Sequence, residues 1–158
     1  MKNVILTLTV IFLGLSLLTV AYAETSLEGC DLTGASLKNC NLSGVTFKNS
    51  TLRDVNFQGA NLSNAIFRSS IMSGSDFRNA NLKGADLSFC DLSDCNFSGA
   101  DLTGANIGGS NLQSATFNKA ILKGANLGST VWPNVICPDG TLSNESGYSC
   151  EGHSSVKK

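Results

Sequence analysis

A large apolar residue recurs at every fifth position through most of this chain, without a break from Leu32 to Leu127. The series has 20 members, of which 12 are Leu, six are Phe, one is Met72 and one is Ile107. A period of five fits neither an α-helix, which repeats every 3.6 residues, nor a strand, which repeats every two. An internal repeat constrains the architecture before any local propensity does, so the fold has to explain this period first.

The neighbours of each large residue complete a five-residue unit. Two places before it stands a small residue, Ala, Cys, Ser or Val, at all 20 positions. Two places after it, nine of the 20 residues are Gly and four are Asn, which most easily adopt the positive φ of a tight turn. The unit predicts a small inward residue, a polar outward residue, a large inward residue and a two-residue corner, so neither hairpins nor helices are expected.

Large residues of one kind recur at every fourth unit. One series is Leu37, Phe57, Phe77, Phe97 and Phe117, and the next contains only Leu. A superperiod of 20 residues explains this, because it stacks like on like in layers about 4.8 Å apart. The sequence therefore predicts an all-β, four-sided solenoid of about five coils, whose interior is filled by side chains and has no room for a ligand.

The pattern resembles that of the pentapeptide-repeat family, A-(D/N)-L-x-x. Close matches begin at Ala60, Ala80, Ala85, Ala100 and Ala125, within about 100 consecutive residues that keep the period. The resemblance implies a right-handed quadrilateral β-helix. It implies little about function, because the family hosts unrelated roles, among them DNA-mimicking proteins that bind gyrase and protect it from quinolones.

The N-terminus is typical of a secretory signal peptide. Lys2 precedes an apolar run over residues 4–20, and the run ends in Ala21-Tyr22-Ala23, an A-x-A cleavage site. An uncleaved membrane anchor is the alternative, since the run is almost long enough to span a bilayer. We expect a periplasmic or secreted protein without a stable membrane anchor after cleavage. Its expected parts are a signal peptide (1–23), the solenoid (24–132) and a C-terminal cap and tail (133–158).

Charge and residue types exclude several classes of function. Without Lys2, ten basic residues face twelve acidic ones, a net charge of −2. So weak a field favours neither nucleic acid nor an anionic membrane as a partner. It also disfavours the DNA-mimicking role, which needs a strongly acidic face and a cytoplasmic location. The single histidine, His153, lies in the tail with no sign of a supporting cleft, so we expect neither an enzyme nor a cofactor.

The six cysteines divide by position. Four occupy the small inward position: Cys30, Cys40, Cys90 and Cys95. We interpret all four as buried small hydrophobes. A disulfide between Cys90 and Cys95, which lie around one corner from each other, is the alternative.

Cys137 and Cys150 lie outside the predicted repeats, in a segment with several turn signals. In an oxidising compartment this pair predicts a disulfide that closes the loop, worth about 3 kcal/mol in the chain-entropy model, with Trp132 beneath it. The alternative is a zinc site that adds His153, but a fourth ligand is not evident. The segment also resembles the C-P-D-G-T…C-E-G-H tail of exported pentapeptide-repeat proteins, which implies a structural cap.

Function on a solenoid lies on its outer faces and its ends. Most outward residues are Asp, Asn, Thr or Ser, so apolar departures are informative. Ile66 and Ile71 point outward on adjacent faces, and Phe89 occupies a corner where Gly or Asn is usual. We expect these three residues to contact a protein partner. The first coil, which begins at Leu27, is a second candidate, because an uncovered coil edge favours self-association.

These patterns predict an exported, non-catalytic scaffold for protein interaction. The DNA-mimicking gyrase-binding protein is the alternative.

Overall fold

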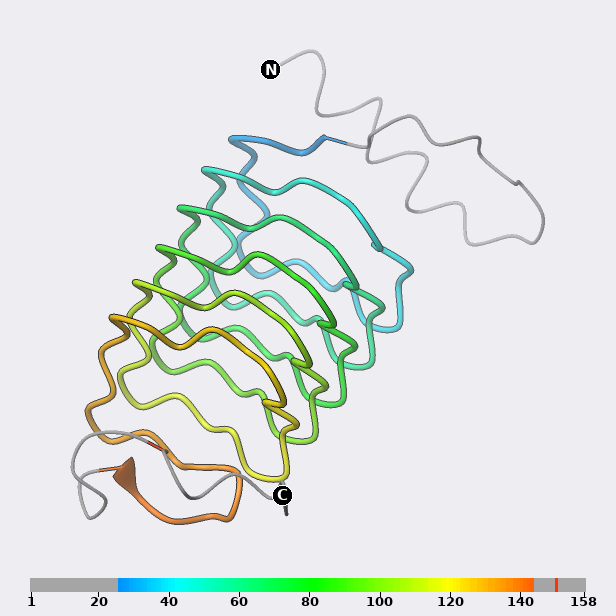
Figure 1. Ribbon diagram of the computed structural model, residues 1–158. Helices are drawn as coiled ribbons and strands as arrows, with labels where there is room; N and C mark the ends of the chain where they lie inside the picture. The colour runs from blue at the N-terminus through cyan, green and yellow to red at the C-terminus, as the bar shows by residue number, and fades with distance from the viewer. Residues whose placement is uncertain (1–25, 144–149, 151–158) are drawn as a thin grey trace.

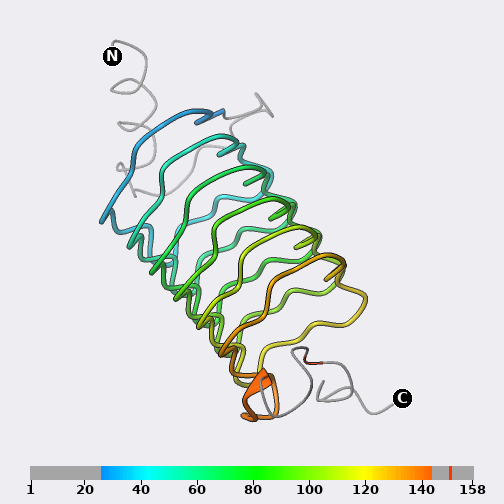
Figure 2. The ribbon, with the colours of Figure 1, turned by 90° about the vertical axis from the view of Figure 1, so that its left-hand side faces the viewer.

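The computed structural model describes residues 26–143 and Cys150, and over this range the backbone forms stacked coils (Figures 1 and 2). Figure 2 shows the coils in one row, each directly beside the next. The predicted signal peptide and His153 lie outside the described residues. No described residue belongs to a helix that is long and apolar enough to cross a bilayer.

Outward residues carry the backbone pairing between coils. Each forms a single parallel bridge to the residue 20 positions later, in an unbroken set of 19 from Ser26–Thr46 to Thr116–Ile136. The amide of Asn56 donates to the Ala35 carbonyl at 2.9 Å, and its carbonyl accepts from the Leu37 amide at 2.8 Å. Between residues 26 and 143 these bridges never lengthen into a strand, because only one inward residue separates each bridge from the next corner. The predicted superperiod of 20 residues is confirmed.

Phenylalanine rings fill much of the interior in two facing stacks. The longer stack consists of Phe57, Phe77, Phe97 and Phe117. Its neighbouring rings are 4.9 Å apart between centroids and within 10° of parallel. Phe47 and Phe67 stack at 5.1 Å on the opposite face, and their rings meet the longer stack edge to face at 5.9–6.3 Å. All six rings are fully buried, so the interior is a packed core.

Every corner turns through a residue with positive φ. Twelve such residues in the described part are not glycine, and their φ angles lie between 55° and 60°. Seven of the twelve are Asn or Asp, which tolerate the left-handed region better than other residues with a Cβ. Phe89 is the one aromatic residue among them.

Serine at the small inward position links neighbouring coils, which the sequence pattern did not indicate. The Ser70 hydroxyl donates to the Phe47 carbonyl at 2.7 Å and accepts from the Ser50 amide at 3.0 Å. At other corners the amide after the turn bonds directly to the carbonyl before it, as the Ala60 amide does to the Phe57 carbonyl at 2.9 Å. Between Ser50 and Phe47 the Ser70 hydroxyl stands in the middle of this bond. The buried hydroxyl is therefore fully used, as buried polar groups must be.

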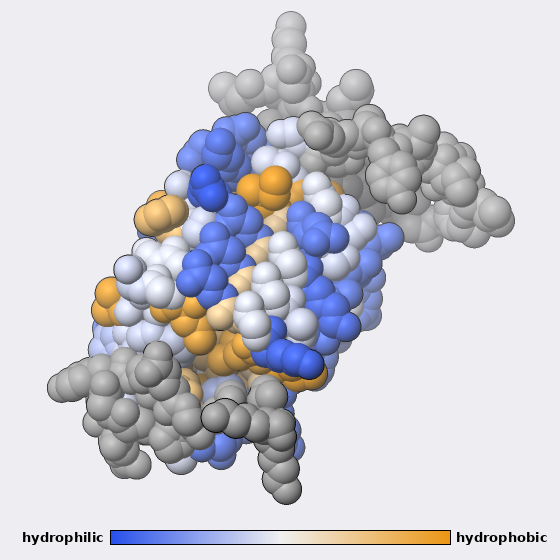
Figure 3. Space-filling view, in the orientation of Figure 1, coloured by the Kyte–Doolittle hydropathy of each residue, from blue (hydrophilic) through white to orange (hydrophobic). Residues whose placement is uncertain are grey.

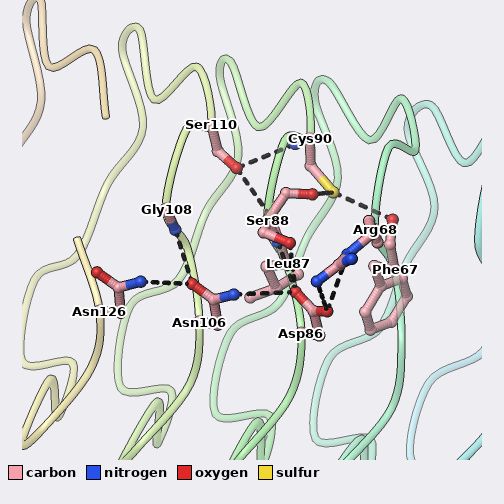
Figure 4. A network of polar contacts seen from close by, with 10 residues as sticks. All are labelled: Phe67, Arg68, Asp86, Leu87, Ser88, Cys90, Asn106, Gly108, Ser110 and Asn126. Carbon is pink, nitrogen blue, oxygen red and sulfur yellow. Dashed lines mark hydrogen bonds and ion pairs between the residues drawn. The ribbon is translucent and has the colours of Figure 1, made fainter. Parts of the chain in front are cut away.

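The four inward cysteines are free thiols, so Cys90 and Cys95 do not form the alternative disulfide. Each of these two thiols donates to a carbonyl of the preceding coil, Cys90 to Phe67 at 3.1 Å (Figure 4) and Cys95 to Met72 at 3.0 Å. Burial raises the pKa of Cys90 to about 12 and also raises the pKa of Cys95. Neither thiol is therefore a nucleophile at neutral pH.

The repeat continues one unit beyond residue 132, the boundary expected from the sequence. Ile136 pairs with Thr116, and Cys137 takes the large inward position, where it is fully buried. The chain then turns back, and residues 141–143 run antiparallel to this last unit. The Cys137 amide donates to the Thr141 carbonyl, and the Ser143 amide donates to the Val135 carbonyl, both at 2.8 Å.

Ser143 does in this cap what the inward serines do in the coils. Its buried hydroxyl donates to the Trp132 carbonyl at 2.5 Å and accepts from the Val135 amide at 3.0 Å. The Cys137–Cys150 disulfide, with an S–S distance of 2.04 Å, closes the segment. Trp132 is buried beside Phe117, at 6.1 Å between ring centroids. The cap thus gives the last unit of the repeat the hydrogen bonds that a further coil would supply.

Candidate functional site

The three predicted contact residues lie around one edge of the solenoid. Ile66 stands on one face and Ile71 on the next, and Ser69 occupies the corner between them. Phe89 occupies the same corner one coil later. We call these four residues the Phe89 edge. The exposed fractions are 38% for Ile66, 36% for Ile71 and 66% for Phe89. The predicted outward orientation of the two isoleucines is confirmed, as is the corner position of Phe89.

Phe89 is held in an unfavourable backbone conformation. Its φ is 58°, in the left-handed region, which is rare for a bulky residue and costs about 1–2 kcal/mol. Its ring lies against Gly109, the corner residue of the next coil. A Cβ added to Gly109 would come within 2.8 Å of the ring atoms Cδ1 and Cε1. The ring therefore needs a glycine at that place.

The same pairing of a corner side chain with a glycine 20 residues later occurs at four other corners. The other pairs are Asn39 with Gly59, Asp54 with Gly74, Asn64 with Gly84 and Asn79 with Gly99. In each, a Cβ on the glycine would approach the side-chain oxygen to within 2.3–2.6 Å. Sequence reasoning missed these pairs, although comparing corner residues at a spacing of 20 would have found them.

Charged groups beside the Phe89 edge neutralise one another. The Arg68 guanidinium lies 3.1 Å from an Asp86 carboxylate oxygen, and both side chains are partly exposed. Asp86 also accepts from the backbone amide and hydroxyl of Ser88 and from the Asn106 side-chain amide (Figure 4). Exposed ion pairs add little stability, so the main effect of this one is a local surface of low net charge.

A shallow groove adjoins Phe89 on its C-terminal side. Its volume is about 310 Å³. Its lining comes from three successive coils: Ser88, Phe89, Asn106, Gly108, Gly109, Asn126, Gly128 and Ser129. None of these residues is charged. Gly108 and Gly128 occupy the position that Lys48 and Arg68 hold in earlier coils, so long side chains are missing where the groove lies.

The outer surface is banded, because each face repeats every 20 residues. Figure 3 shows stripes of similar hydropathy that run along the solenoid. Carboxylates on these faces are spaced out by Asn, Thr and Ile, and three of them pair with a cation: Asp76 with Arg78, Asp86 with Arg68 and Asp101 with Lys83. Hydrogen bonds from Arg78 lower the pKa of Asp76, so this carboxyl is no candidate general acid.

Metal ligands do not gather in the described part of the chain, where no three His, Cys, Asp or Glu side chains could share an ion. The alternative zinc site needs Cys137 and Cys150, and these two sulfurs are bonded to each other.

Comparison with known proteins follows the repeats. The sequence model of one protein family, pentapeptide repeats, matches this chain over residues 30–68, 60–99 and 95–131. These matches contain eight copies of the repeat. No curated protein matches the chain.

Several solved structures resemble this one. A pentapeptide repeat protein (Rfr23) from the cyanobacterium Cyanothece 51142 is 22% identical, with a TM-score of 0.65 over 66% of this chain and 85% of that one. The pentapeptide repeat protein alr5209 from Nostoc Pcc 7120 is 27% identical, with a TM-score of 0.52 over 56% and 70% of the two chains. QnrB1, a plasmid-mediated fluoroquinolone resistance protein, is 23% identical in one trypsin-treated form, with a TM-score of 0.50 over 72% and 71%. The likeness to Rfr23 and QnrB1 shows the fold alone, and that fold is the right-handed quadrilateral β-helix.

Proposed function

Because the chain belongs to the pentapeptide-repeat family, we propose that it is an exported, non-catalytic scaffold that binds a protein through the Phe89 edge. One observation carries the proposal, namely that Ile66, Ile71 and Phe89 gather at one edge of a surface that is otherwise mostly polar. Covering them would remove apolar surface from water. Aromatic residues are also enriched at the centres of protein interfaces.

The position of the Phe89 edge supports this choice over the other exposed apolar residues. Ile121, Val131 and Leu142 are also exposed, but they belong to the last coil and the cap. Ile66, Ile71 and Phe89 lie in the middle coils, where packing above and below holds the backbone rigid. A rigid surface binds with a smaller loss of conformational entropy.

The DNA-mimicking alternative fits the surface less well. Such a role needs a continuous row of carboxylates to imitate phosphates. The outward series that contains Ile71 reads Asp31, Thr51, Ile71, Asp91, Asn111 and Val131, and the ion pairs described above neutralise other carboxylates. QnrB1 resembles this chain in fold, and no outward column between residues 26 and 136 is an acidic row that would extend the likeness.

Self-association through the N-terminal coil stays a separate prediction. Ser26 is the first residue that pairs with a later coil, so within the described range no earlier coil covers this edge. Sedimentation of the exported protein at high concentration tests the idea. A single monomeric species would contradict it.

The scaffold proposal is tested by cross-linking capture from the exported fraction. The bait is the exported protein, compared with a variant that carries Ile66→Asp, Ile71→Asp and Phe89→Ser. An Ile121→Asp variant is the matched control, because Ile121 is exposed to a similar extent (43%) on another face. We expect one protein to be captured by the wild type and the control and lost with the triple variant. Equal capture by all three would overturn the proposed site.

A further inference from the structure

The backbone of Phe89 is in a strained conformation that must be stabilised by the rest of the fold. A bulky residue at φ 58° is strained, Gly109 is required beneath its ring, and most of the residue remains in solvent. Packing does not explain this residue, because Ser69 and Ser129 occupy the same corner in the coils at distances of 20 and 40 residues. A strained and exposed aromatic residue that the fold does not need indicates a role in binding.

The groove beside the ring is open because two glycines replace long side chains. In the first coils the corresponding positions hold Lys48 and Arg68, whereas Gly108 and Gly128 follow in the coils next to Phe89. The lining extends over three coils, and the first and third of these are about 10 Å apart at the layer spacing of a β-structure. The space therefore suits an extended ligand of a few small rings better than a single small molecule.

Two side-chain amides, those of Asn106 and Asn126, also line the groove. The Asn126 amide donates to the Asn106 oxygen at 2.9 Å, and the Asn106 amide donates to Asp86 at 3.4 Å (Figure 4). Their oxygens accept from the backbone amides of Gly108 and Gly128. Because an amide nitrogen carries two N–H groups, each Asn keeps one donor that no described residue uses. The row is thus held in place and can still bind a ligand.

The chemistry of the lining selects the class of ligand. No lining residue is charged, so the groove offers nothing to neutralise a phosphate, a carboxylate or a cation. It offers an exposed aromatic ring for an apolar ring face and amides and hydroxyls for polar groups at the rim. Sugars combine an apolar C–H face with hydroxyl groups around it. We propose that the groove of Phe89, Asn106 and Asn126 binds a neutral oligosaccharide of two or three sugar units.

The proposal is tested by titrating the exported protein with cellotetraose, chitotetraose and maltotetraose. The side-chain NH₂ signals of Asn106 and Asn126 are followed by NMR. We expect at least one of these sugars to shift both signals with saturation at millimolar concentration. If none does so, the proposal is overturned.

Three variants assign binding to the groove. Phe89→Ser removes the ring and should weaken binding by about tenfold, while Phe89→Tyr keeps a ring of the same shape and should retain the affinity. Gly128→Lys should abolish binding, because it places in the groove the side chain that Lys48 has in an earlier coil. Unchanged affinity in Phe89→Ser and Gly128→Lys would show that the sugar binds elsewhere, and would overturn the proposal.

The sugar site and the proposed protein site share Phe89 but are otherwise separable. A variant with Ile66→Asp and Ile71→Asp should lose protein capture and keep sugar binding, while Gly128→Lys should do the opposite. If no sugar binds and Gly128→Lys also loses capture of the protein, the groove belongs to the protein contact, and the sugar proposal is wrong. If sugars bind and no protein is captured, the scaffold proposal fails alone.

Discussion

The interior phenylalanine stack and the Phe89 edge use the same residue type under opposite conditions. Phe77 is fully buried between Phe57 and Phe97, at a position where the repeat requires a large apolar residue. Phe89 is two-thirds exposed, at a position where the repeat favours glycine or asparagine. In a chain this regular, agreement with the repeat explains packing, and departure from it marks the surface where function is to be sought.

The largest loss of stability should follow from removing a ring of the interior stack. Phe77→Ala leaves a cavity between two stacked rings and should lower the free energy of unfolding by about 3–5 kcal/mol. Denaturant titration of the protein measures the loss. A decrease of less than about 1 kcal/mol would mean that the coils collapse around the gap and that the stack is not a rigid core.

A substitution at Gly109 tests whether the position of the Phe89 ring depends on the glycine beneath it. Gly109→Ala combines a Cβ at φ +73° with a clash against the Phe89 ring, so it should destabilise by about 2–3 kcal/mol. Gly124→Ala is the matched control, since its φ is +68° and no atom lies within 4 Å of the added Cβ. The control should lose only about 1–2 kcal/mol. Equal losses in the two variants would show that the ring moves aside freely.

Replacing Phe89 itself should leave the protein as stable as before or make it slightly more stable. Phe89→Asn introduces a residue that accepts positive φ and occupies several other corners. We expect the free energy of unfolding to stay the same or rise by up to about 1 kcal/mol, while binding at the edge is lost. Thermal unfolding alongside the capture assay checks both parts. Destabilisation by more than about 1 kcal/mol would mean that the ring contributes to packing after all.

The smallest effect is expected on the outer surface next to Phe77. Arg78 donates to Asp76 at 2.6–3.0 Å and lowers the carboxyl pKa below its ordinary 3.8. A carboxyl with a depressed folded-state pKa stabilises the protein above its unfolded pKa and loses that contribution as pH falls through the folded pKa. Arg78→Gln should therefore lower the free energy of unfolding only slightly at pH 7, and the difference should vanish at low pH. A difference that persists at about pH 2 would assign the loss to packing of the Arg78 side chain.

Much of the fold could be predicted from the sequence, because inward and outward positions differ in residue type at every repeat. The recurrence of phenylalanine every 20 residues around Phe77 already indicated that residues 20 apart pair between coils. The hydroxyl links could not be predicted, since Ser70 looks like any other small residue until the facing carbonyl is known. The cap and its disulfide were predicted, but the extra repeat unit within the cap was not, because Cys137 reads as a loop cysteine although it takes an inward position.

The candidate site was predicted in its apolar half only. Ile66, Ile71 and Phe89 differ in kind from their neighbours in the repeat, so each could be identified singly. The groove could not, because Gly108 and Gly128 look like ordinary turn residues. Only the alignment of successive coils shows that they lie side by side and next to the ring.

The 20-residue pairing also sets the steps in which such a chain can change length. Deleting a whole coil would leave every face aligned with itself across the junction, since each outward residue would still meet one from the same series. Deleting five residues would rotate everything downstream by a quarter turn and would put a leucine column against a phenylalanine column. Insertion or deletion of whole coils therefore changes how far along the solenoid axis a side chain lies, but leaves it on the same face.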